Sequence, residues 1–197
     1  MSATVVLASK SFVRRRMLID AGLDVDVVSP GVDEDAIKTR MAGQSAEAIS
    51  RALAEAKARA VSLRRLNDWV IGADQMLRLD GQHYGKVSST DAAETRLKLM
   101  RGRTHELVSS VALARAGEIR CGEVDAASLT MRDFSDDFLT SYLKLAGEGI
   151  LASVGCYEYE GLGAQLFERV EGDFYTILGL PLLALLAMLR EEGVLPE

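Results

Sequence analysis

The chain has 197 residues, of which 48% are hydrophobic and 26% charged, and its formal net charge is −6. This composition is that of a globular protein large enough to bury a core, and it excludes disordered and fibrous classes. The negative charge argues against a nucleic acid polymer as partner, so a small anionic ligand needs a local basic pocket. Cys121 and Cys156 have neither metal-ligand spacing nor the number of a disulfide framework, which favours reduced thiols and a cytoplasmic protein.

Two apolar segments bear on targeting and membranes. The first, residues 4–8, is too short for a secretory signal and leads into arginines. The second, residues 180–189, has about half the length that a membrane span needs. We therefore expect no membrane partner, and we interpret the second segment as a buried helix or an oligomer contact.

The first strand leads directly into a cluster of cations. Residues 4–8 predict a buried strand, and Ser9, Lys10 and Ser11 precede a helix that begins with residues 14–16, all arginine. Arginines in a first turn oppose the helix dipole, whereas free N–H groups at that end suit an anion. This turn therefore suggests a phosphate chain as ligand. The alternative is that the arginines only solubilise a surface turn, and this segment alone does not decide between the two.

A second group of elements surrounds Asp74. Residues 45–63 predict a helix with Ser45 as its cap and with Lys57 on or beside the apolar stripe. Residues 69–73 predict a buried strand that continues through Asp74 and Gln75 to a turn at Asp80-Gly81. The stripe that we expect on the helix consists of Ile49, Leu53, Ala56 and Ala60.

The register of the hairpin at Asp80-Gly81 bears on Lys86. A two-residue turn places Lys86 opposite Gln75, whereas Asp74 lies one residue along and points to the other face. A bulge or a loop exit at Gly85 is therefore needed to bring Lys86 and Asp74 together.

The remaining chain alternates helical and strand patterns, which predicts an α/β or α+β layer structure. We expect a helix over about 91–100 with a capping box at Asp91 and Glu94, an antiparallel pair at 105–114 and 118–131, a helix capped by Ser135, strands at 150–154 and 165–170, and a final helix that Pro181 opens.

Several of these residues are candidates for chemistry. A carboxylate at Asp74, directly after an apolar strand, needs a cation, hydrogen-bond donors or a metal as partner. The alternative is an N–H acceptor in a strand-end turn. Glu34 pairs with Asp74 in one interpretation, holding Mg²⁺ or Mn²⁺ through two carboxylates. Lys57 and Lys86 are either inward cations for such a site or, respectively, a snorkelling lysine and an ordinary turn lysine.

Taken together, the segments resemble the Maf family of nucleoside triphosphate pyrophosphatases. They occur in the family's order and cover nearly the whole chain, although no single motif is specific. The matching segments are Leu7-Ala8-Ser9-Lys10-Ser11 with Arg14, Val32-Asp33-Glu34, residues 53–58, Ile71-Gly72-Ala73-Asp74, Gly85-Lys86, Gly102-Arg103 with His105, Gly155 with Tyr157, and Gly172-Asp173 leading to Gly179-Leu180-Pro181-Leu182.

The resemblance implies one domain over residues 1–197 with a mixed α/β fold. In this Maf/ITPase-like fold a central mixed sheet is flanked by helices, the substrate cleft lies between two lobes, and the protein is often a homodimer. The implied reaction is hydrolysis of a nucleoside triphosphate to its monophosphate and pyrophosphate with a divalent cation, Mg²⁺, Mn²⁺ or Co²⁺. The family's proton acceptor maps onto Asp74, and its other cleft residues map onto Ser9, Arg14, Glu34, Lys57 and Lys86.

Three positions bear on the base within this family. The dTTP and UTP branch typically has Thr after the Asp and Gln in the late glycine loop, whereas Gln75 and Glu160 stand there in this chain and look like the 7-methyl-GTP branch. A carboxylate accepts hydrogen bonds from guanine and suits a cationic methylated base. Val13, at a further specificity position, matches neither branch, and Phe12 and Val87 replace two prolines of the family's motifs. The alternatives are a dTTP/UTP pyrophosphatase and a nucleotide-binding regulator of cell division with little turnover.

Overall fold

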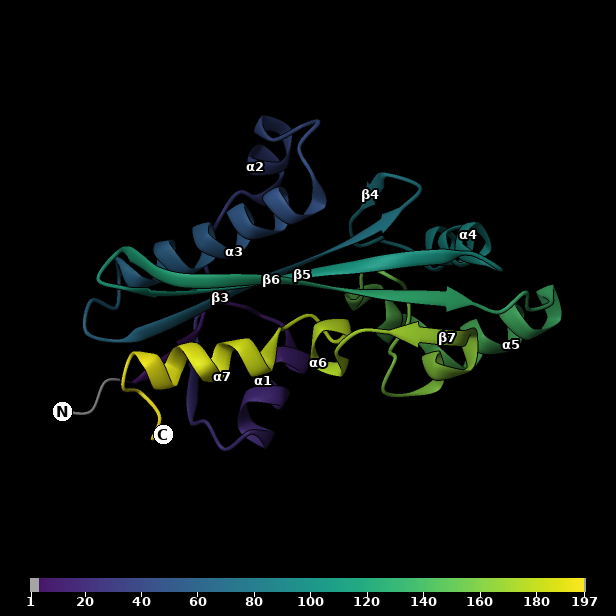
Figure 1. Ribbon diagram of the computed structural model, residues 1–197. Coiled ribbons are helices and arrows are strands. Elements are labelled where there is room, and N and C mark those ends of the chain that lie inside the picture. Colours follow the sequence, from purple (N-terminus) through teal and green to yellow (C-terminus); the bar gives the residue numbers. More distant parts are fainter. Residues whose placement is uncertain (1–3, 197) are drawn as a thin grey trace. The chain divides into compact units, whose positions relative to one another are not determined.

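The computed structural model describes residues 4–196, so the outermost residues of the expected domain lie outside the described part (Figure 1). Within it, seven strands hydrogen-bond in the order β2-β1-β3-β5-β6-β7, with β4 pairing to β3. The sheet is mixed, because β1 is parallel to β2 and β3 whereas β4 and β7 are antiparallel to β3 and β6. The elements are β1 (Val5–Leu7), α1 (Phe12–Asp20), β2 (Val25–Val27), α2 (Glu34–Arg40), α3 (Ala46–Ser62), β3 (Trp69–Leu79), β4 (Gln82–Tyr84), α4 (Thr90–Met100), β5 (Thr104–Arg115), β6 (Glu118–Met131), α5 (Asp136–Ala146), the 3₁₀ helices η1 (Gly147–Ala152) and η2 (Leu162–Leu166), β7 (Phe167–Glu171), α6 (Phe174–Ile177) and α7 (Leu182–Glu191). The expected mixed α/β fold is confirmed.

The chain divides into two compact units, and β3, β5 and β6 each contribute to both. Unit 1 comprises the described parts of Met1–Gln75, Val108–Asp125 and Phe174–Glu197. Unit 2 comprises Met76–Leu107 and Ala126–Asp173. The substrate cleft expected between two lobes stays a prediction.

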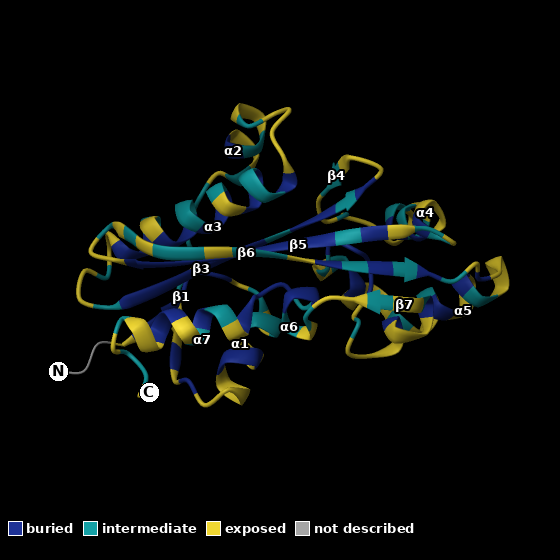
Figure 2. Cartoon of the chain, viewed as in Figure 1, coloured by how far each residue is buried: buried dark blue, intermediate teal, exposed yellow. Residues whose placement is uncertain are grey.

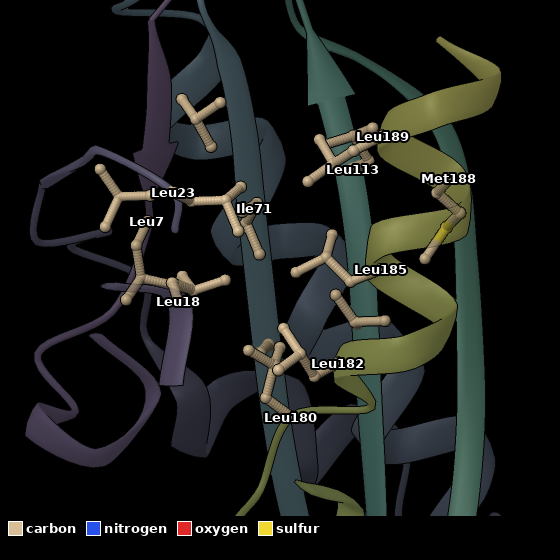
Figure 3. Close-up of a cluster of buried hydrophobic side chains, with 14 of the residues drawn as sticks. Leu7, Leu18, Leu23, Ile71, Leu113, Leu180, Leu182, Leu185, Met188 and Leu189 are labelled. Carbon is tan, nitrogen blue, oxygen red and sulfur yellow. The ribbon is translucent and has the colours of Figure 1, made fainter. Parts of the chain in front are cut away.

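Unit 1 buries both faces of its part of the sheet. Side chains alternate along a strand, so Leu7 and Ile71 face α1 and α7, whereas Val6 and Val70 face α3. Figure 3 shows α7 side chains such as Leu185 directed toward the strands, with Leu7 and Ile71 among the packed residues. Figure 2 accordingly shows β1 and the unit 1 part of β3 as buried, which explains why the pattern there reads as continuous apolar runs.

The contact between α3 and β3 depends on a glycine. A Cβ at Gly72 would lie 2.1 Å from the carbonyl oxygen of Ala54 and 2.6 Å from the backbone nitrogen of Ala58. Only glycine therefore allows the helix backbone to lie this close to the strand. The cap at Ser45 is confirmed, since its hydroxyl accepts from the Ala48 N–H. The expected apolar stripe is wrong in part: Ala56 and Ala60 are half-buried, and the face toward the sheet instead contains Ala54, Lys57, Ala58 and Val61.

Unit 2 contains the expected hairpin. Asp80 and Gly81 have φ values of 49° and 75°, as a tight two-residue turn requires, and Leu79 pairs with Gln82 across it. Further along, the rings of His105, Tyr157 and Phe167 lie against one another. The cap at Ser135 is confirmed, because its hydroxyl accepts from the Phe138 N–H.

Three local predictions are wrong. Residues 150–154 are not a strand: η1 covers Gly147–Ala152, and a bend and turns follow. The short apolar run is buried only in part and has no strand partner. The helix expected from Asp91 begins at Thr90 with Ser89 as its cap, so Asp91 and Glu94 form no capping box. The strand expected over residues 165–170 begins at Phe167, since η2 extends to Leu166.

Within residues 4–196, no helix has the length and apolar character needed to cross a membrane. Residues 180–189 instead supply Leu180 and most of α7, with Leu182, Leu185 and Leu189 buried. Leu183 remains 63% exposed on the outer side of the helix. The interpretation of this segment as a buried helix is confirmed.

Candidate active site

A buried lysine joins two carboxylates on the α3 face of β3. The Lys57 ammonium lies 2.6 Å from Oδ1 of Asp74 and 2.9 Å from Oε1 of Glu34. Lys57 and Asp74 are each only 6% exposed. Glu34, the first residue of α2, is more accessible, with 41% of its side chain exposed. The structure thus brings together three of the predicted residues, and Lys57 is an inward cation rather than a snorkelling one.

The charges at this site shift the pKa of Glu34. Partial burial raises the pKa of its carboxyl, but the charge and the hydrogen bond of Lys57, with smaller effects from Lys38 and Arg14, bring it below the ordinary value. Glu34 is therefore anionic at neutral pH. An ammonium between two carboxylates compensates a buried anion that would otherwise be costly, because an unpaired charge in the interior loses its hydration.

Arg14 lies at the start of α1 and is committed to backbone carbonyls. Its Nε donates to the carbonyl oxygen of Gly179 at 2.8 Å, and its Nη1 donates to that of Ala73 at 2.9 Å. Burial lowers the pKa of this guanidinium, and the charges of Asp74 and Glu34 oppose that effect. Arginine has five N–H donors, so these two bonds leave others for a phosphate. Arg16, by contrast, pairs with Asp20 on the surface.

The two other predicted residues near α1 have structural contacts. Ser9 is 7% exposed, and its hydroxyl accepts a hydrogen bond from the Ser11 N–H at 3.1 Å. Val13 packs against the apolar cluster between the sheet and α7. Its part in base selection stays a prediction.

Gln75 follows Asp74 and, by the alternation of the strand, points to the opposite face. Its amide nitrogen lies 3.1 Å from the Ser109 hydroxyl and 3.1 Å and 3.0 Å from the carbonyl oxygens of Thr176 and Ile177. The expected role of Gln75 in base selection stays a prediction, and these contacts give it a structural role besides.

Sequence reasoning missed four buried hydroxyl residues around the strand: Ser50, Ser109, Ser110 and Thr176, all with 0% exposure. The Ser50 hydroxyl lies 2.6 Å from that of Ser110 and 3.4 Å from the carbonyl oxygen of Asp74. Buried hydroxyls need partners, and here the partners come from distant segments of the chain. A hydroxyl-bearing residue inside an apolar run is the signal that marks Ser109 and Ser110 in the sequence.

The two predicted residues of unit 2 lie in loops. Lys86 follows β4, which ends at Tyr84, and the pairing of Leu77 with Tyr84 has the register that we expected. The chain leaves the strand before Gly85, which is one of the two conditions, a bulge or a loop exit, that we named for bringing Lys86 toward Asp74. Glu160 is exposed in the turn before η2. The parts of Lys86 and Glu160 in the site stay predictions.

The two carboxylates, Asp74 and Glu34, bear on the divalent metal that the resemblance implies. Among residues 4–196, no three or more His, Cys, Asp or Glu side chains gather into a group that could hold a metal ion. Mg²⁺ is usually held by one or two carboxylates together with waters and substrate phosphates. Asp74 and Glu34, which share one ammonium, fit that arrangement and do not fit a site closed by protein ligands alone.

Comparison with known proteins decides the family. The sequence model of the family described as Maf-like protein matches residues 4–192. The chain belongs to the Maf-like family. This confirms the resemblance found in the sequence, which rested on an ordered set of weak motifs.

Curated relatives agree over their full length. The chain is 47% identical to a nucleoside triphosphate pyrophosphatase of Maricaulis maris, over 98% of each chain. It is 45% identical to a 7-methyl-GTP pyrophosphatase of Mesorhizobium japonicum, over 99% of each chain. Among solved structures, a nucleoside-triphosphatase / dITP/XTP pyrophosphatase of Mycobacterium abscessus matches with a TM-score of 0.42 and 17% identity, over 96% of this chain and 97% of that one. The family assignment rests on the sequence matches and needs no support from this structural likeness.

Proposed function

We propose that this Maf-like protein is a pyrophosphatase that hydrolyses 7-methyl-GTP to its monophosphate and pyrophosphate, and so removes a modified nucleotide. The coarser activity, a hydrolase that acts on the anhydride of a nucleoside triphosphate, follows from the family and from relatives of that name. The choice of 7-methyl-GTP has the support of one relative's name and of Glu160 in the sequence. We further propose a cytoplasmic location and a homodimer.

The observation that carries the proposal is the buried Lys57 shared by Asp74 and Glu34. Two carboxylates and an ammonium in one partly buried place provide a proton acceptor, metal ligands and a cation for phosphate oxygens. A protein that only bound nucleotides would have no evident need for a carboxylate that is 6% exposed. Burial strengthens each of these charge interactions, because water screens them less.

In the proposed reaction, water attacks the α-phosphorus. The bond between the water oxygen and the α-phosphorus forms, the bond to the bridging oxygen of the β-phosphate breaks, and pyrophosphate leaves. Lys57 holds Oδ1 of Asp74, so we assign the water proton to Oδ2 of that carboxylate. Arg14 and Lys86 are the cations that we assign to the triphosphate, with Ser9 as a further donor.

Asp74 and Glu34 would hold the divalent cation. When bound, Mg²⁺, Mn²⁺ or Co²⁺ would neutralise charge on the phosphate oxygens. The residues of the chain contribute orientation: Lys57 fixes both carboxylates, and Ser50 reaches the carbonyl oxygen of Asp74. A pre-positioned carboxylate reduces the entropic cost of bringing water and phosphorus together.

Product analysis with four nucleotides tests the proposal. We expect pyrophosphate and the monophosphate from 7-methyl-GTP in preference to GTP, UTP and dTTP, with Mg²⁺, Mn²⁺ or Co²⁺ present. In ¹⁸O-water the label should enter the monophosphate. Release of orthophosphate as the direct product, or label in the pyrophosphate, would contradict attack at the α-phosphorus.

The Glu160→Gln variant tests the choice of base. A carboxylate suits the donors of a cationic guanine, whereas an amide suits a pyrimidine, so the preference should move toward UTP and dTTP by about ten- to a hundredfold, the value of a hydrogen bond to a charged group. Exposed Glu148 on η1 offers a matched control, Glu148→Gln, which should keep the wild-type preference. An unchanged preference in Glu160→Gln would remove Glu160 from base selection.

A further inference from the structure

The two residues that flank Asp74 in sequence, Ala73 and Gln75, are both linked to one distant segment, residues 174–179: Ala73 through Arg14, and Gln75 directly. Residues alternate along a strand, so Asp74 faces α3 whereas its neighbour Gln75 faces the opposite side, where Phe174–Gly179 passes. The same alternation holds on β5: Ser110 meets Ser50 of α3, and Ser109 meets Gln75. Gln75 is thus directed away from the carboxylate that it follows.

The amide nitrogen of Gln75 is already in use. Its two N–H groups face three acceptors within 3.1 Å: the Ser109 hydroxyl and the carbonyl oxygens of Thr176 and Ile177. Ser109 in turn donates to the carbonyl oxygen of Thr176 at 2.8 Å. A nucleobase that accepted a hydrogen bond from this amide would have to break contacts with buried groups, which is costly.

The segment is held at two further points. The Thr176 hydroxyl donates to Oδ2 of Asp125 at 2.7 Å. Arg14 bridges the carbonyl oxygens of Gly179 and of Ala73, the residue before Asp74. A Cβ at Gly179, where φ is +96°, would lie 3.4 Å from both Nη2 of Arg14 and Oε1 of Gln75. Gly179 is therefore linked through Arg14 to Ala73 and lies close to Gln75, the two residues that flank Asp74 in sequence.

We propose that Gln75, Ser109 and Thr176 form a clamp that positions Asp74 by fixing the 174–179 segment to β3. The proposal rests on the proposed function, because its kinetic effect is on Asp74 as proton acceptor. These three are positioning residues, since they act through the strand. A carboxylate displaced by about 1 Å loses much of its rate advantage.

Two variants open the clamp, and a third serves as a matched control. Gln75→Met keeps an unbranched side chain of similar length without the amide, and Ser109→Ala removes one buried hydroxyl. Ser62→Ala removes another hydroxyl of 0% exposure, which lies at the C-terminal end of α3 and accepts from the Gly117 N–H. The full chain is used throughout, with 7-methyl-GTP and UTP as substrates and with amide hydrogen exchange of residues 73–75 and 174–180 as a second measurement.

We expect Gln75→Met and Ser109→Ala to lower kcat by about ten- to a hundredfold on both nucleotides, with KM changed by less than about twofold. Hydrogen exchange at the two segments should rise in both variants. Ser62→Ala should retain wild-type kcat and wild-type exchange there, even if its melting temperature falls.

Two outcomes would overturn the clamp. One is unchanged hydrogen exchange of residues 73–75 and 174–180 in Gln75→Met, which would show that the amide does not hold the segment. The other is unchanged exchange and kcat in Ser109→Ala. Failure of the proposed function would look different: the wild-type chain itself would release no pyrophosphate, and the exchange measurement would still decide whether the clamp holds the segment.

Discussion

Each unit buries ionisable groups, but those of unit 1 form ion pairs, whereas the buried histidine of unit 2 is neutral. In unit 1, Lys57 and Asp74 are paired at 2.6 Å, with Glu34 beside them. In unit 2, His105 is 1% exposed and lies among aromatic rings, with Nε2 at 2.7 Å from the Tyr157 hydroxyl. Burial lowers the pKa of His105 to about 4, so its ring is neutral at pH 7.

This difference distinguishes a group of residues suited to chemistry from one that only packs. A buried group that becomes neutral avoids the cost of desolvating a charge, whereas a buried group that stays charged needs a partner. The Nδ1 of His105 is buried and has no hydrogen-bond partner among residues 4–196, and burial also raises the pKa of Tyr157 well above its ordinary value. The aromatic cluster of unit 2 therefore fits a structural role, while the ion pair of unit 1 fits chemistry.

The largest expected effect is loss of activity in Asp74→Asn. An amide keeps the shape of the side chain but cannot take the water proton, so kcat should fall by about 10²- to 10⁴-fold. Pyrophosphate release measures it, and circular dichroism should show an unchanged fold. Asp91→Asn, on the exposed first turn of α4, is the control and should remain fully active. Wild-type turnover in Asp74→Asn would place the proton acceptor elsewhere.

Next in size is the stability of Lys57→Met. Without its cation Asp74 would be a buried charge with no ion-pair partner on α3, and breaking one partner of a buried pair costs about 3–5 kcal/mol. Urea unfolding at pH 7 measures the loss. Lys98→Met, which breaks the exposed pair between Lys98 and Glu94, should cost less than about 1 kcal/mol. Equal losses in the two variants would end the distinction between the site and the surface.

The pH dependence of His105→Phe comes third. The unfolded chain binds a proton at His105 below about pH 6.5, whereas the folded chain does so only near pH 4. As the pH is lowered from about 6.5 to about 4, the free energy of unfolding of the wild-type chain should therefore decrease by up to about 3 kcal/mol because of this group. Below about pH 4 the group should cause no further decrease. Urea unfolding at several pH values should give a shallower dependence for His105→Phe. Parallel curves would show that the histidine is not buried as a neutral ring.

The smallest effect is expected at Glu34. Its folded pKa lies below the ordinary value, so its contribution to stability is present above about pH 4.5 and is lost as the pH falls through the folded pKa. Because the side chain is 41% exposed, Glu34→Gln should cost less than about 1 kcal/mol at neutral pH. Unfolding at pH 7 and pH 3 checks both the size and the sign. A larger cost at pH 3 than at pH 7 would contradict the shift.

Features set by neighbouring residues were predictable from the sequence. The hairpin at Asp80-Gly81 depends on two positions that accept positive φ, and the caps at Ser45 and Ser135 bond to N–H groups three residues away. Asp74 stands out because a carboxylate within an apolar strand has few explanations. The run at 150–154 misled because a short apolar stretch with no visible partner fits a buried 3₁₀ turn as well as a strand.

Features set by distant residues were not predictable. Ser109 meets Thr176, which lies 67 residues further along the chain, and Arg14 meets Gly179 at a separation of 165. A serine within an apolar run indicates that its hydroxyl is buried, but nothing local indicates which distant residue it bonds. The two carbonyl groups that accept from Arg14 were likewise not predictable. The sequence suggested only that this arginine binds phosphate, and the structure adds that it holds the backbone.

Gly72 and Asp74 lie on the same side of β3, two residues apart, and the helix that passes within touching distance of the first also carries the lysine that neutralises the second. Because Gly72 has no side chain, α3 can lie close enough to β3 for Lys57 to reach Asp74. Adding a methyl group there would push α3 outward and carry its ammonium away from the carboxylate, so a single carbon atom would change how strongly the anion is compensated.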